Sequence, residues 1–378
     1  MIYFDNSATT KLYPEVAEFM LKYEKENYFN PSGIYKPSIK VFNDILSARK
    51  DLLKVLGANS HKVLFTASAT EANNYALRCF IKKNQKILVS EGEHSSVFET
   101  AMYLKSNNTQ VEFVKLNNDG TLNLDDLEKK LTNDVGLVSF IHASNETGAV
   151  NDAKKISQIV KAKCPNSLVH FDGVQAFCKM PVGLSNLGID LYTVSSHKIH
   201  GPKGVGALVF NERLSPKPLI FGGGQESGVR SGTENSIGIL GFVMASKIMF
   251  QNLERNTSHI QNLKSSLLEK ISHLPFTING NVKNTLPNIL SLSFGGIRGE
   301  VLVHMLEADE VYISTGSSCN SKHTGNRTLF GMGKTKAEEE GNIRISFCEQ
   351  NTLEEVFKFA DILEKNLIKL KELGIWKK

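Results

Sequence analysis

The sequence predicts an α/β fold in which a large domain with a mostly parallel, doubly wound sheet is followed by a smaller α+β domain. Short apolar runs alternate with helical patterns through the middle of the 378-residue chain, and such alternation is typical of a parallel sheet with helices on both faces. Several of these runs are almost continuously apolar, as expected for strands that are buried on both sides. The last third combines longer helical patterns with a few separated strands, which indicates a second module.

The large domain is expected to span residues 15–254 and to contain seven strands separated by helices. The strand candidates are residues 62–67, 86–90, 110–116, 135–143, 167–172, 191–196 and 206–210, and each is a short run dominated by apolar residues. Helical patterns lie between them at residues 71–83, 95–106, 124–131 and 153–163.

The smaller domain is expected to span residues 255–378, and its boundary falls inside one long helical segment, residues 236–271. Strand candidates follow at residues 276–281, 288–294, 311–314 and 342–347, with one helix at 299–308 and another that closes the chain. We expect segment 1–14 to cross back and join the two domains.

Composition limits the classes of partner. The formal net charge is +5, from 44 basic and 39 acidic residues, and this mild excess argues against a nucleic-acid-binding tail. The start of the chain does not resemble a signal peptide, and no apolar run approaches the roughly 18–20 residues that span a bilayer. We therefore expect a soluble cytoplasmic protein without a membrane partner. The spacings of the five cysteines fit neither a disulfide framework nor a CxxC metal site, so no metal is expected.

Polar residues with distinct chemical capacities follow five of the predicted strands. In open parallel sheets, ligands bind beyond the carboxyl ends of the strands. The residues at these positions are Thr70, His94, Asn145, Asp172 and Lys198. Their convergence predicts a ligand site at this edge of the sheet.

Lys198 and Asp172 together suggest pyridoxal phosphate (PLP). Lys198 follows an apolar strand, and a lysine in partly desolvated surroundings can form a Schiff base with an aldehyde; the alternative is a surface lysine on a loop. Asp172 ends a purely apolar strand, where a buried carboxylate needs a cationic partner. The pyridinium nitrogen of PLP would serve, whereas the alternative is an ordinary helix N-cap.

A phosphate group would also need a binding site. Ala69 and Thr70 lie at a strand-to-helix turn, where backbone N–H groups and a hydroxyl bind phosphate well. Ser195 could add a second hydroxyl. Thr233 and Arg230 lie on a Gly-rich turn that could contribute or could be a plain surface turn.

Three further side chains fit the same site but also have ordinary interpretations. His94 could stack on a cofactor ring and move protons, or it could cap the following helix. Asn145 and Gln175 could donate to the phenolic oxygen of the cofactor, or they could be turn and cap residues.

Cys319 and Arg344 are candidates for contact with a substrate. Cys319 lies in a Ser/Gly-rich loop with Lys322 and His323 downstream, and nearby cations favour the nucleophilic thiolate. The other four cysteines lie in apolar contexts, where an inert role is expected. Arg344 belongs to an alternating strand, and it either faces solvent or grips a substrate carboxylate with two hydrogen bonds.

The motifs of the chain, taken together, resemble those of a known family. The motifs that carry the resemblance, in order, are FDNSATT, FNPSG, FTASATEANN, EHSSV, NETG, FDGVQ, DLYTVSSHKIHGPKGVGAL, RSGTEN, TGSSC and RISF. They are similar to those of the NifS/IscS-type cysteine desulfurases, which belong to the class V PLP-dependent aminotransferases and have fold type I. The resemblance covers nearly the whole chain.

The resemblance implies a reaction that converts L-cysteine to L-alanine on a homodimer. Lys198 would bind PLP covalently, and Cys319 would attack the substrate sulfur and carry it as a persulfide to an acceptor for iron–sulfur cluster assembly or tRNA or cofactor thiolation. Arg344, with Asn30 nearby, would bind the substrate carboxylate. The other implied contacts are Asp172 to the ring nitrogen, His94 to the ring face, Asn145 and Gln175 to the phenolic oxygen, Ala69, Thr70, Ser195 and His197 to the phosphate, and Thr233 to the phosphate of the partner subunit.

Two alternatives remain at this stage. One is a different PLP reaction, such as that of a selenocysteine lyase or another class V aminotransferase. The other is a sulfur carrier or scaffold protein that retains the fold without turnover.

Overall fold

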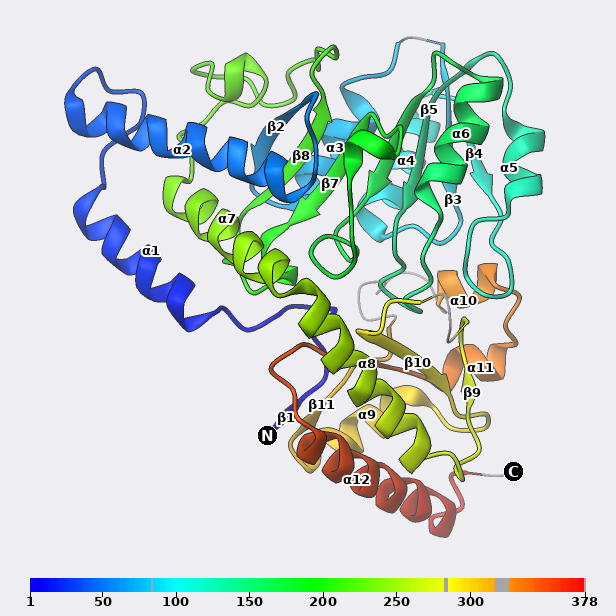
Figure 1. Cartoon of the computed structure of the whole chain (residues 1–378). Coiled ribbons are helices and arrows are strands. Elements are labelled where there is room, and N and C mark those ends of the chain that lie inside the picture. The colour runs from blue at the N-terminus through cyan, green and yellow to red at the C-terminus, as the bar shows by residue number, and fades with distance from the viewer. Residues whose placement is uncertain (83, 282–284, 317–325, 377–378) are drawn as a thin grey trace.

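The computed structural model describes residues 1–82, 84–281, 285–316 and 326–376, and its central feature is a seven-stranded sheet (Figure 1). The strands lie in the order β2 (His61–Thr66), β8 (Gly206–Asn211), β7 (Leu191–Ser195), β6 (Leu168–Asp172), β5 (Val135–Ile141), β3 (Lys86–Ser90) and β4 (Val111–Val114). All neighbours from β7 to β4 run parallel, whereas β8 is antiparallel to both β2 and β7. The predicted α/β fold with a mostly parallel sheet is therefore confirmed.

Helices cover both faces of this sheet, which explains why its strands are apolar throughout. Successive side chains of a strand point to opposite faces, and in β2 Leu64 packs with one cluster while Val63 and Phe65 pack with the other. The face of Leu64 is covered by α3 (Ala69–Arg78) and α4 (Ser95–Ser106). The opposite face is covered by α2 (Lys36–Val55), α5 (Leu124–Lys130), α6 (Ala153–Lys163) and α7 (Ser236–Gln251), and α1 (Pro14–Glu26) packs on α7.

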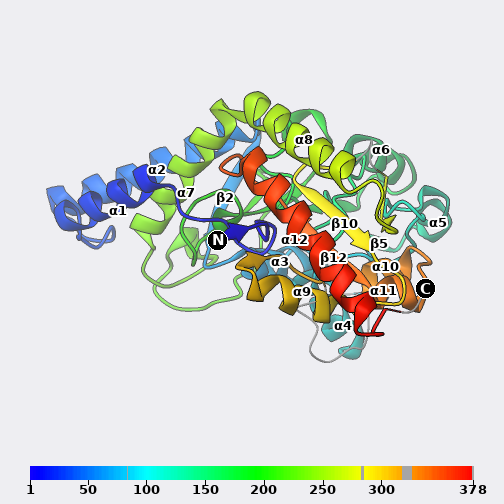
Figure 2. The ribbon, with the colours of Figure 1, turned by 90° about the horizontal axis from the view of Figure 1, so that it is seen from below.

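The rest of the described chain forms a smaller α+β unit below the large sheet in Figure 1. Its helices are α8 (Leu253–Lys270), α9 (Gly299–Ala308), α10 (Arg327–Gly331), α11 (Lys336–Glu340) and α12 (Leu353–Glu372). Its strands are β9 (Thr277–Ile278), β10 (Ile289–Ser293), β11 (Val311–Tyr312) and β12 (Asn342–Ser346). β10 lies between β12 and β9 and is antiparallel to both. Figure 2 shows α8 and α12 side by side over this unit.

The N-terminal segment belongs to the smaller unit at its start and to the large one at its end. β1 (Ile2–Tyr3) pairs in parallel with β11, and Phe4 is fully buried in the core of the small unit. A few residues further on, the backbone N–H of Thr10 donates to the carbonyl of His197, which lies in the large unit. This crossing supports the proposed role of segment 1–14 as the connection between two domains.

The long helical segment predicted over residues 236–271 is not one helix, and that prediction is wrong. The chain breaks at Asn252 between α7 and α8, whose axes are bent by 72°. Because of the bend, the two helices pack into different hydrophobic cores: Phe242 of α7 packs with the large sheet, and Leu263 of α8 packs in the small unit. The break supports a domain boundary near residue 255, which stays a proposal.

No single helix within the described ranges is both long and apolar enough to cross a membrane; α7 and α8 taken together meet that requirement by length and composition only.

Candidate active site

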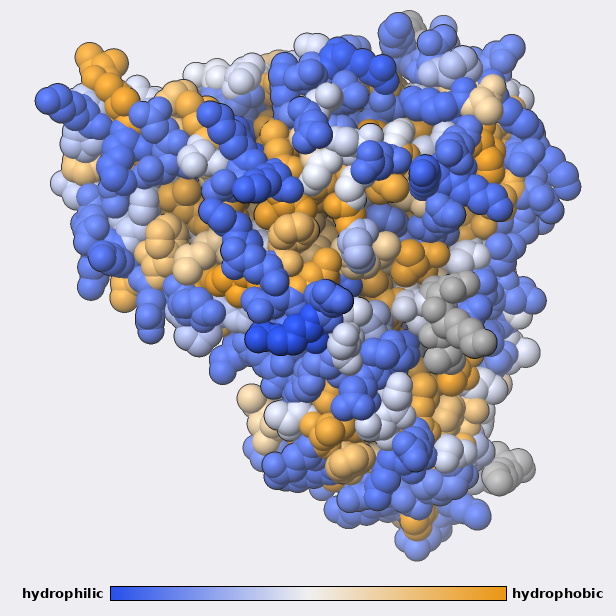
Figure 3. All heavy atoms as spheres, viewed as in Figure 1, coloured by the Kyte–Doolittle hydropathy of each residue, from blue (hydrophilic) through white to orange (hydrophobic). Residues whose placement is uncertain are grey.

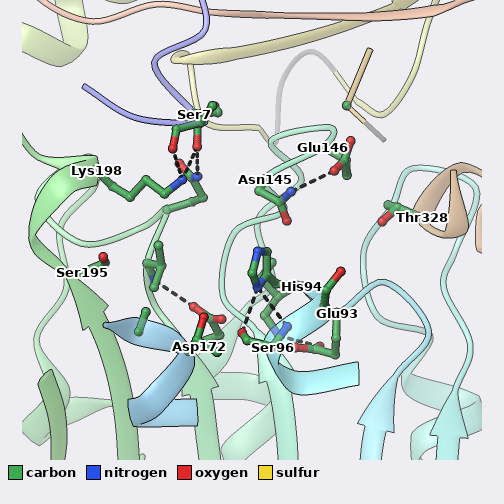
Figure 4. Close-up of a pocket in the computed structure, with 18 of the residues that line it drawn as sticks. Ser7, Glu93, His94, Ser96, Asn145, Glu146, Asp172, Ser195, Lys198 and Thr328 are labelled. Atoms are coloured by element: carbon green, nitrogen blue, oxygen red, sulfur yellow. Dashed lines mark hydrogen bonds between the residues drawn. The ribbon is translucent and has the colours of Figure 1, made fainter. Parts of the chain in front are cut away.

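A cavity of about 320 Å³ lies at the carboxyl ends of the parallel strands, where the large sheet meets the small unit. Loops after β3, β5, β6 and β7 form one side, and the N-terminal segment and residues near β12 form the other (Figure 4). The lining includes nine residues that the sequence singles out: Ala69, Thr70, His94, Asn145, Asp172, Gln175, Ser195, His197 and Lys198; Arg344 joins them from the small unit.

Asp172 forms the floor of the cavity at the end of β6 and is buried. Its Oδ2 accepts a hydrogen bond of 2.8 Å from the side-chain amide of Asn73, and its Oδ1 accepts one of 3.0 Å from the backbone N–H of Val174. Both donors are neutral, so the negative charge is held in place without being compensated by them. Such a carboxylate is suited to a cationic group of a ligand.

His94 lies next to Asp172 and caps helix α4 (Figure 4). Its Nδ1 accepts a hydrogen bond from the backbone N–H of Ser96 at 3.1 Å. Burial lowers the pKa of His94, and the charge of Lys198 acts in the same direction against the raising effect of Asp172. The imidazole is therefore neutral, with Nδ1 as acceptor and the proton on Nε2. His94 can therefore cap α4 through Nδ1 and still contact a ligand in the cavity.

Lys198 lies in a single 3-10 turn, η2 (Ser196–Lys198), directly after β7. Its Nζ donates hydrogen bonds of 2.6 Å to the backbone carbonyls of Ser7 and Ala8 (Figure 4). The chain packs closely around this turn at Gly201, where a Cβ would lie 2.2 Å from the Oγ of Ser196 and 3.1 Å from its backbone carbonyl oxygen. The lysine is thus held at the cavity by the segment that crosses between the two units.

The far end of the cavity is built from the start of α3 and the end of β7. Ser68 is the N-cap of α3 and accepts from Glu71 N, while Ala69 and Thr70 form the first turn. Gly206 lets this helix start lie directly against β8, because a Cβ at that position would lie 2.8 Å from the backbone nitrogen of Ala69. Backbone N–H groups at such a helix start attract anions.

His197 and Ser195 complete this end. The Nδ1 of His197 lies 3.1 Å from the Oγ1 of Thr9. Burial, followed by the charges of Lys198 and Lys203, lowers the pKa of His197 to about 4, so the imidazole is neutral at physiological pH. A neutral imidazole can donate from one ring nitrogen to a phosphate while the other meets Thr9.

Arg344 contributes a buried cation from β12 of the small unit. Its Nη2 lies 2.9 Å from the Oδ1 of Asp5, and its Nη1 donates to the backbone carbonyl of Asn145 at 3.0 Å. The first contact is an ion pair with the N-terminal segment, and the second reaches the large unit. Arg344 therefore fixes the two sides of the cavity relative to each other.

Two of the predicted residues do not line this cavity, and a third lies outside the described part of the chain. Asn30 and Thr233 are exposed and do not line it, and Asn30 accepts a local hydrogen bond from Ser32 N at 2.9 Å. Cys319 lies outside the described residues, together with Lys322 and His323. The roles predicted for all three candidate residues stay predictions.

Four residues that shape the site were not predicted from the sequence: Asn73, Ser96, Glu93 and Lys179. The amide of Asn73 bridges Ser96 and Asp172 with two hydrogen bonds of 2.8 Å. Glu93 is buried at the cavity, where its Oε1 accepts from Ile141 N at 2.7 Å, and burial raises its pKa to about 8. A signal was present for Glu93, which directly precedes His94 after a strand, but the other three look like ordinary helix or loop residues in sequence.

The residues at the cavity fit PLP. The charge of Asp172, held by neutral donors, suits a pyridinium nitrogen. The helix start at Ala69 and Thr70, with the close approach that Gly206 allows, suits the phosphate. Lys198 lies at the same cavity with an amine that can bind an aldehyde.

The fold and the lining of this cavity are those of an α/β enzyme from a PLP-dependent family. The chain belongs to the class V aminotransferase family, whose model matches residues 2–359.

Similar proteins agree with this assignment. The chain is 33% identical to a protein named cysteine desulfurase IscS from Clostridium botulinum, covering 99% of this chain and 96% of that one. It is 32% identical to cysteine desulfurase IscS 1 from Archaeoglobus fulgidus, covering 99% of each. Among solved structures, a NifS-like protein matches with a TM-score of 0.92 and 36% identity, covering 98% of this chain and all of that one. A NifS-like protein from Rickettsia africae matches with a TM-score of 0.89 and 31% identity, covering 97% and 99%.

Proposed function

We propose that the protein is a PLP-dependent cysteine desulfurase that converts L-cysteine to L-alanine and transfers the sulfur to Cys319. The observation that carries this proposal is the convergence of Lys198, Asp172 and His94 on one cavity, with Arg344 entering from the small unit. The relatives named cysteine desulfurase, which align over almost the whole chain, support the same conclusion.

The cofactor would be held at three points. Lys198 would bind the aldehyde carbon, Asp172 would pair with the ring nitrogen, and the helix start at Thr70 would bind the phosphate together with Ser195 and His197. The neutral ring of His94 would lie against the cofactor ring, and the side chains of Asn145 and Gln175 would face its phenolic oxygen. All of these residues line the cavity, which supports the assignment.

The chain's own groups would orient the substrate and move its protons. When bound, PLP withdraws electrons from the α-carbon of the amino acid attached to it. Arg344 would bind the substrate carboxylate through two parallel hydrogen bonds. Lys198 would take and return the α-proton, and His94 would move a proton at Nε2, because its Nδ1 is occupied by the N–H of Ser96.

Cys319, in its thiolate form, would accept the sulfur of the substrate. Its sulfur attacks the sulfur of the substrate, so that an S–S bond forms while the C–S bond breaks. The electron pair of the C–S bond stays on the carbon, which takes up a proton and becomes the methyl group of alanine. The persulfide on Cys319 then passes its outer sulfur to an acceptor, for iron–sulfur cluster assembly or for tRNA or cofactor thiolation. We also propose that the protein is located in the cytoplasm.

The working form would be a homodimer in which Thr233 completes the phosphate site of the partner subunit. Large apolar side chains are exposed along α1 and α2 and the loop between them, with Tyr28 71% exposed and Ile34 94% exposed, and Phe221 is 80% exposed. Figure 3 shows apolar surface on this side of the molecule, around α1, α2 and α7. Burial of such a surface in a subunit contact would be favourable, and it would bring Thr233 to a neighbouring chain.

The test is substitution of Cys319. Purified wild-type protein with PLP should release alanine from L-cysteine, and mass spectrometry should find one additional sulfur atom on Cys319. The Cys319→Ser variant should bind PLP but lose persulfide formation and sulfur transfer. Cys164→Ser is the matched control, because the buried Cys164 Sγ only donates to the carbonyl of Thr132 at 3.2 Å and serine can do the same. Unchanged sulfide release by Cys319→Ser would favour another class V reaction.

A further inference from the structure

Lys179 is a buried lysine beside the cofactor cavity, and it has no role in the proposed reaction. It lies in the turn that follows β6, four residues after Gln175, and only 7% of it is exposed to solvent. Its Nζ donates a hydrogen bond of 2.8 Å to the Oε1 of Gln175. A buried lysine is costly unless its ammonium is compensated, so its position next to a cavity residue needs an explanation.

The hydrogen bonds around Gln175 determine the orientation of its side-chain amide. An ammonium can only donate, so the atom of Gln175 that faces Lys179 must be the oxygen. The other end, Nε2, donates to the backbone carbonyl of Ser7 at 3.1 Å. The same carbonyl accepts from the Nζ of Lys198 at 2.6 Å. A continuous chain of contacts therefore runs from Lys179 through Gln175 and Ser7 to Lys198.

The charges around Lys179 make its proton easy to lose. Burial lowers the pKa of Lys179 to about 7, and the positive charges of Lys198 and Arg344 act in the same direction. The negative charge of Glu349 opposes this shift but does not cancel it. The charge of this amine therefore changes near physiological pH.

A second cavity of about 600 Å³ gives this amine a separate environment. Lys179 lines it together with Met180, Pro181 and Lys155, whereas Gln175 lines the cofactor cavity. The hydrogen-bonded pair thus spans the wall between the two cavities. The amine can exchange protons on its own side while the amide faces the cofactor.

We propose that Lys179 is a positioning residue whose ammonium holds the Gln175 amide with its N–H₂ group toward Ser7 and the cofactor cavity. A neutral amine can accept as well as donate, so once the proton is lost Lys179 no longer selects one orientation of the amide, and only the Ser7 carbonyl still favours the observed one. The orientation with the N–H₂ group toward the cavity is then less strongly favoured, and the opposite orientation becomes more populated. This inference rests on the proposed function, in which Gln175 faces the phenolic oxygen of PLP.

The consequence is a shift in the titration of bound PLP. A hydrogen-bond donor at the phenolic oxygen stabilises its deprotonated, anionic form. Removing the ammonium should therefore raise the apparent pKa of the bound cofactor by about one unit.

The experiment follows the visible absorbance of bound PLP as a function of pH, which needs no turnover. Lys179→Met should raise the apparent pKa by about one unit, and Lys179→Gln, which keeps a hydrogen-bonding group in case the apolar variant does not fold, should do the same. Lys155→Met is the matched control, because this lysine lines the same second cavity and should leave the titration unchanged.

A double variant tests whether the effect passes through Gln175. In a Gln175→Leu background, Lys179→Met should no longer shift the titration. A full shift in that background would overturn the inference, because the charge would then act directly, and so would a folded Lys179 variant that titrates like the wild type. If the wild-type protein itself shows no PLP absorbance, the proposed function fails instead, and the two failures are distinguishable.

Discussion

The side-chain amide of Asn73 donates a hydrogen bond of 2.8 Å to the Oδ2 of Asp172, which links the middle of helix α3 to the end of β6. The same amide donates to the Oγ of Ser96, which in turn contacts the Nδ1 of His94 at 2.8 Å. One buried asparagine thus connects the two residues expected to meet the ring nitrogen and the ring face of PLP.

Asn73→Ala should weaken PLP binding by about tenfold, because loss of a hydrogen bond to a buried carboxylate is worth about 1–3 kcal/mol. Without the donor, the Asp172 side chain is held less firmly and pairs less well with the ring nitrogen. The dissociation constant of PLP, measured by equilibrium dialysis, checks this. Asn74→Ala is the control, since the side chain of Asn74 only donates to the carbonyl of Thr70 on the same helix. Equal affinities of the two variants would contradict the assigned role of Asn73.

Glu93→Gln should change how stability depends on pH. Burial raises the pKa of Glu93 to about 8, well above its ordinary value of about 4.5, so the folded protein retains a proton that the unfolded chain releases. Its stabilising contribution is fully present below about pH 4.5 and is lost as the pH rises toward about 8. An amide does not titrate and should keep the hydrogen bonds from Ser90 or Ile141 N in part.

The melting temperature of Glu93→Gln relative to wild type should therefore rise between about pH 5 and about pH 8. Glu269→Gln, at an exposed position of α8, is the control and should show no such trend. A constant difference across this pH range would show that Glu93 is ionised in the folded protein.

Arg344→Lys should raise the KM for L-cysteine by at least about tenfold and lower kcat less. A lysine keeps the positive charge but cannot make two parallel hydrogen bonds to a carboxylate, nor reach both Asp5 and the carbonyl of Asn145. Steady-state kinetics separates the two constants. Arg298→Lys, at an exposed position of the small unit, is the control. An unchanged KM would place the substrate carboxylate elsewhere.

Thr233 can be tested with mixed dimers. Lys198→Ala and Thr233→Ala should each impair the homodimer, the first by loss of cofactor attachment and the second by loss of a phosphate contact. If Thr233 serves the partner's site, a dimer of one subunit of each kind contains one intact site and regains activity. Co-expression with two different affinity tags isolates this species. Activity no higher than that of the Thr233→Ala homodimer would show that Thr233 acts within its own subunit or not at all.

The sequence could predict the residues of the site that follow strands. Asp172, Lys198 and Asn145 each follow an apolar strand, and the carboxyl ends of parallel strands share one edge of the sheet. Their meeting at one cavity therefore required only the correct fold class. The same argument fails for Thr233, because its expected site belongs to a second subunit.

Asn73 and Lys179 could not be predicted because their roles depend on packing between elements. Asn73 lies inside a helix and is distinguished from Asn74 only by the face that α3 turns toward β6. Lys179 follows an apolar turn, and its sequence context does not reveal that the folded chain buries it beside Gln175. The bend at Asn252 was likewise hidden, since a continuous helical pattern does not reveal that its two halves pack into separate cores.

The pairing of Ile2 with Val311 has a consequence for how the chain folds during synthesis. The ribosome makes Ile2 and Phe4 about three hundred residues before their partners in the small unit. The large sheet, whose contacts are mostly complete by residue 251, can form first, as domains generally fold in the order of their synthesis. Until the small unit has been synthesised, the apolar residues Ile2 and Phe4 have no surface to pack against. Chaperones that recognise short apolar segments should bind them during this time.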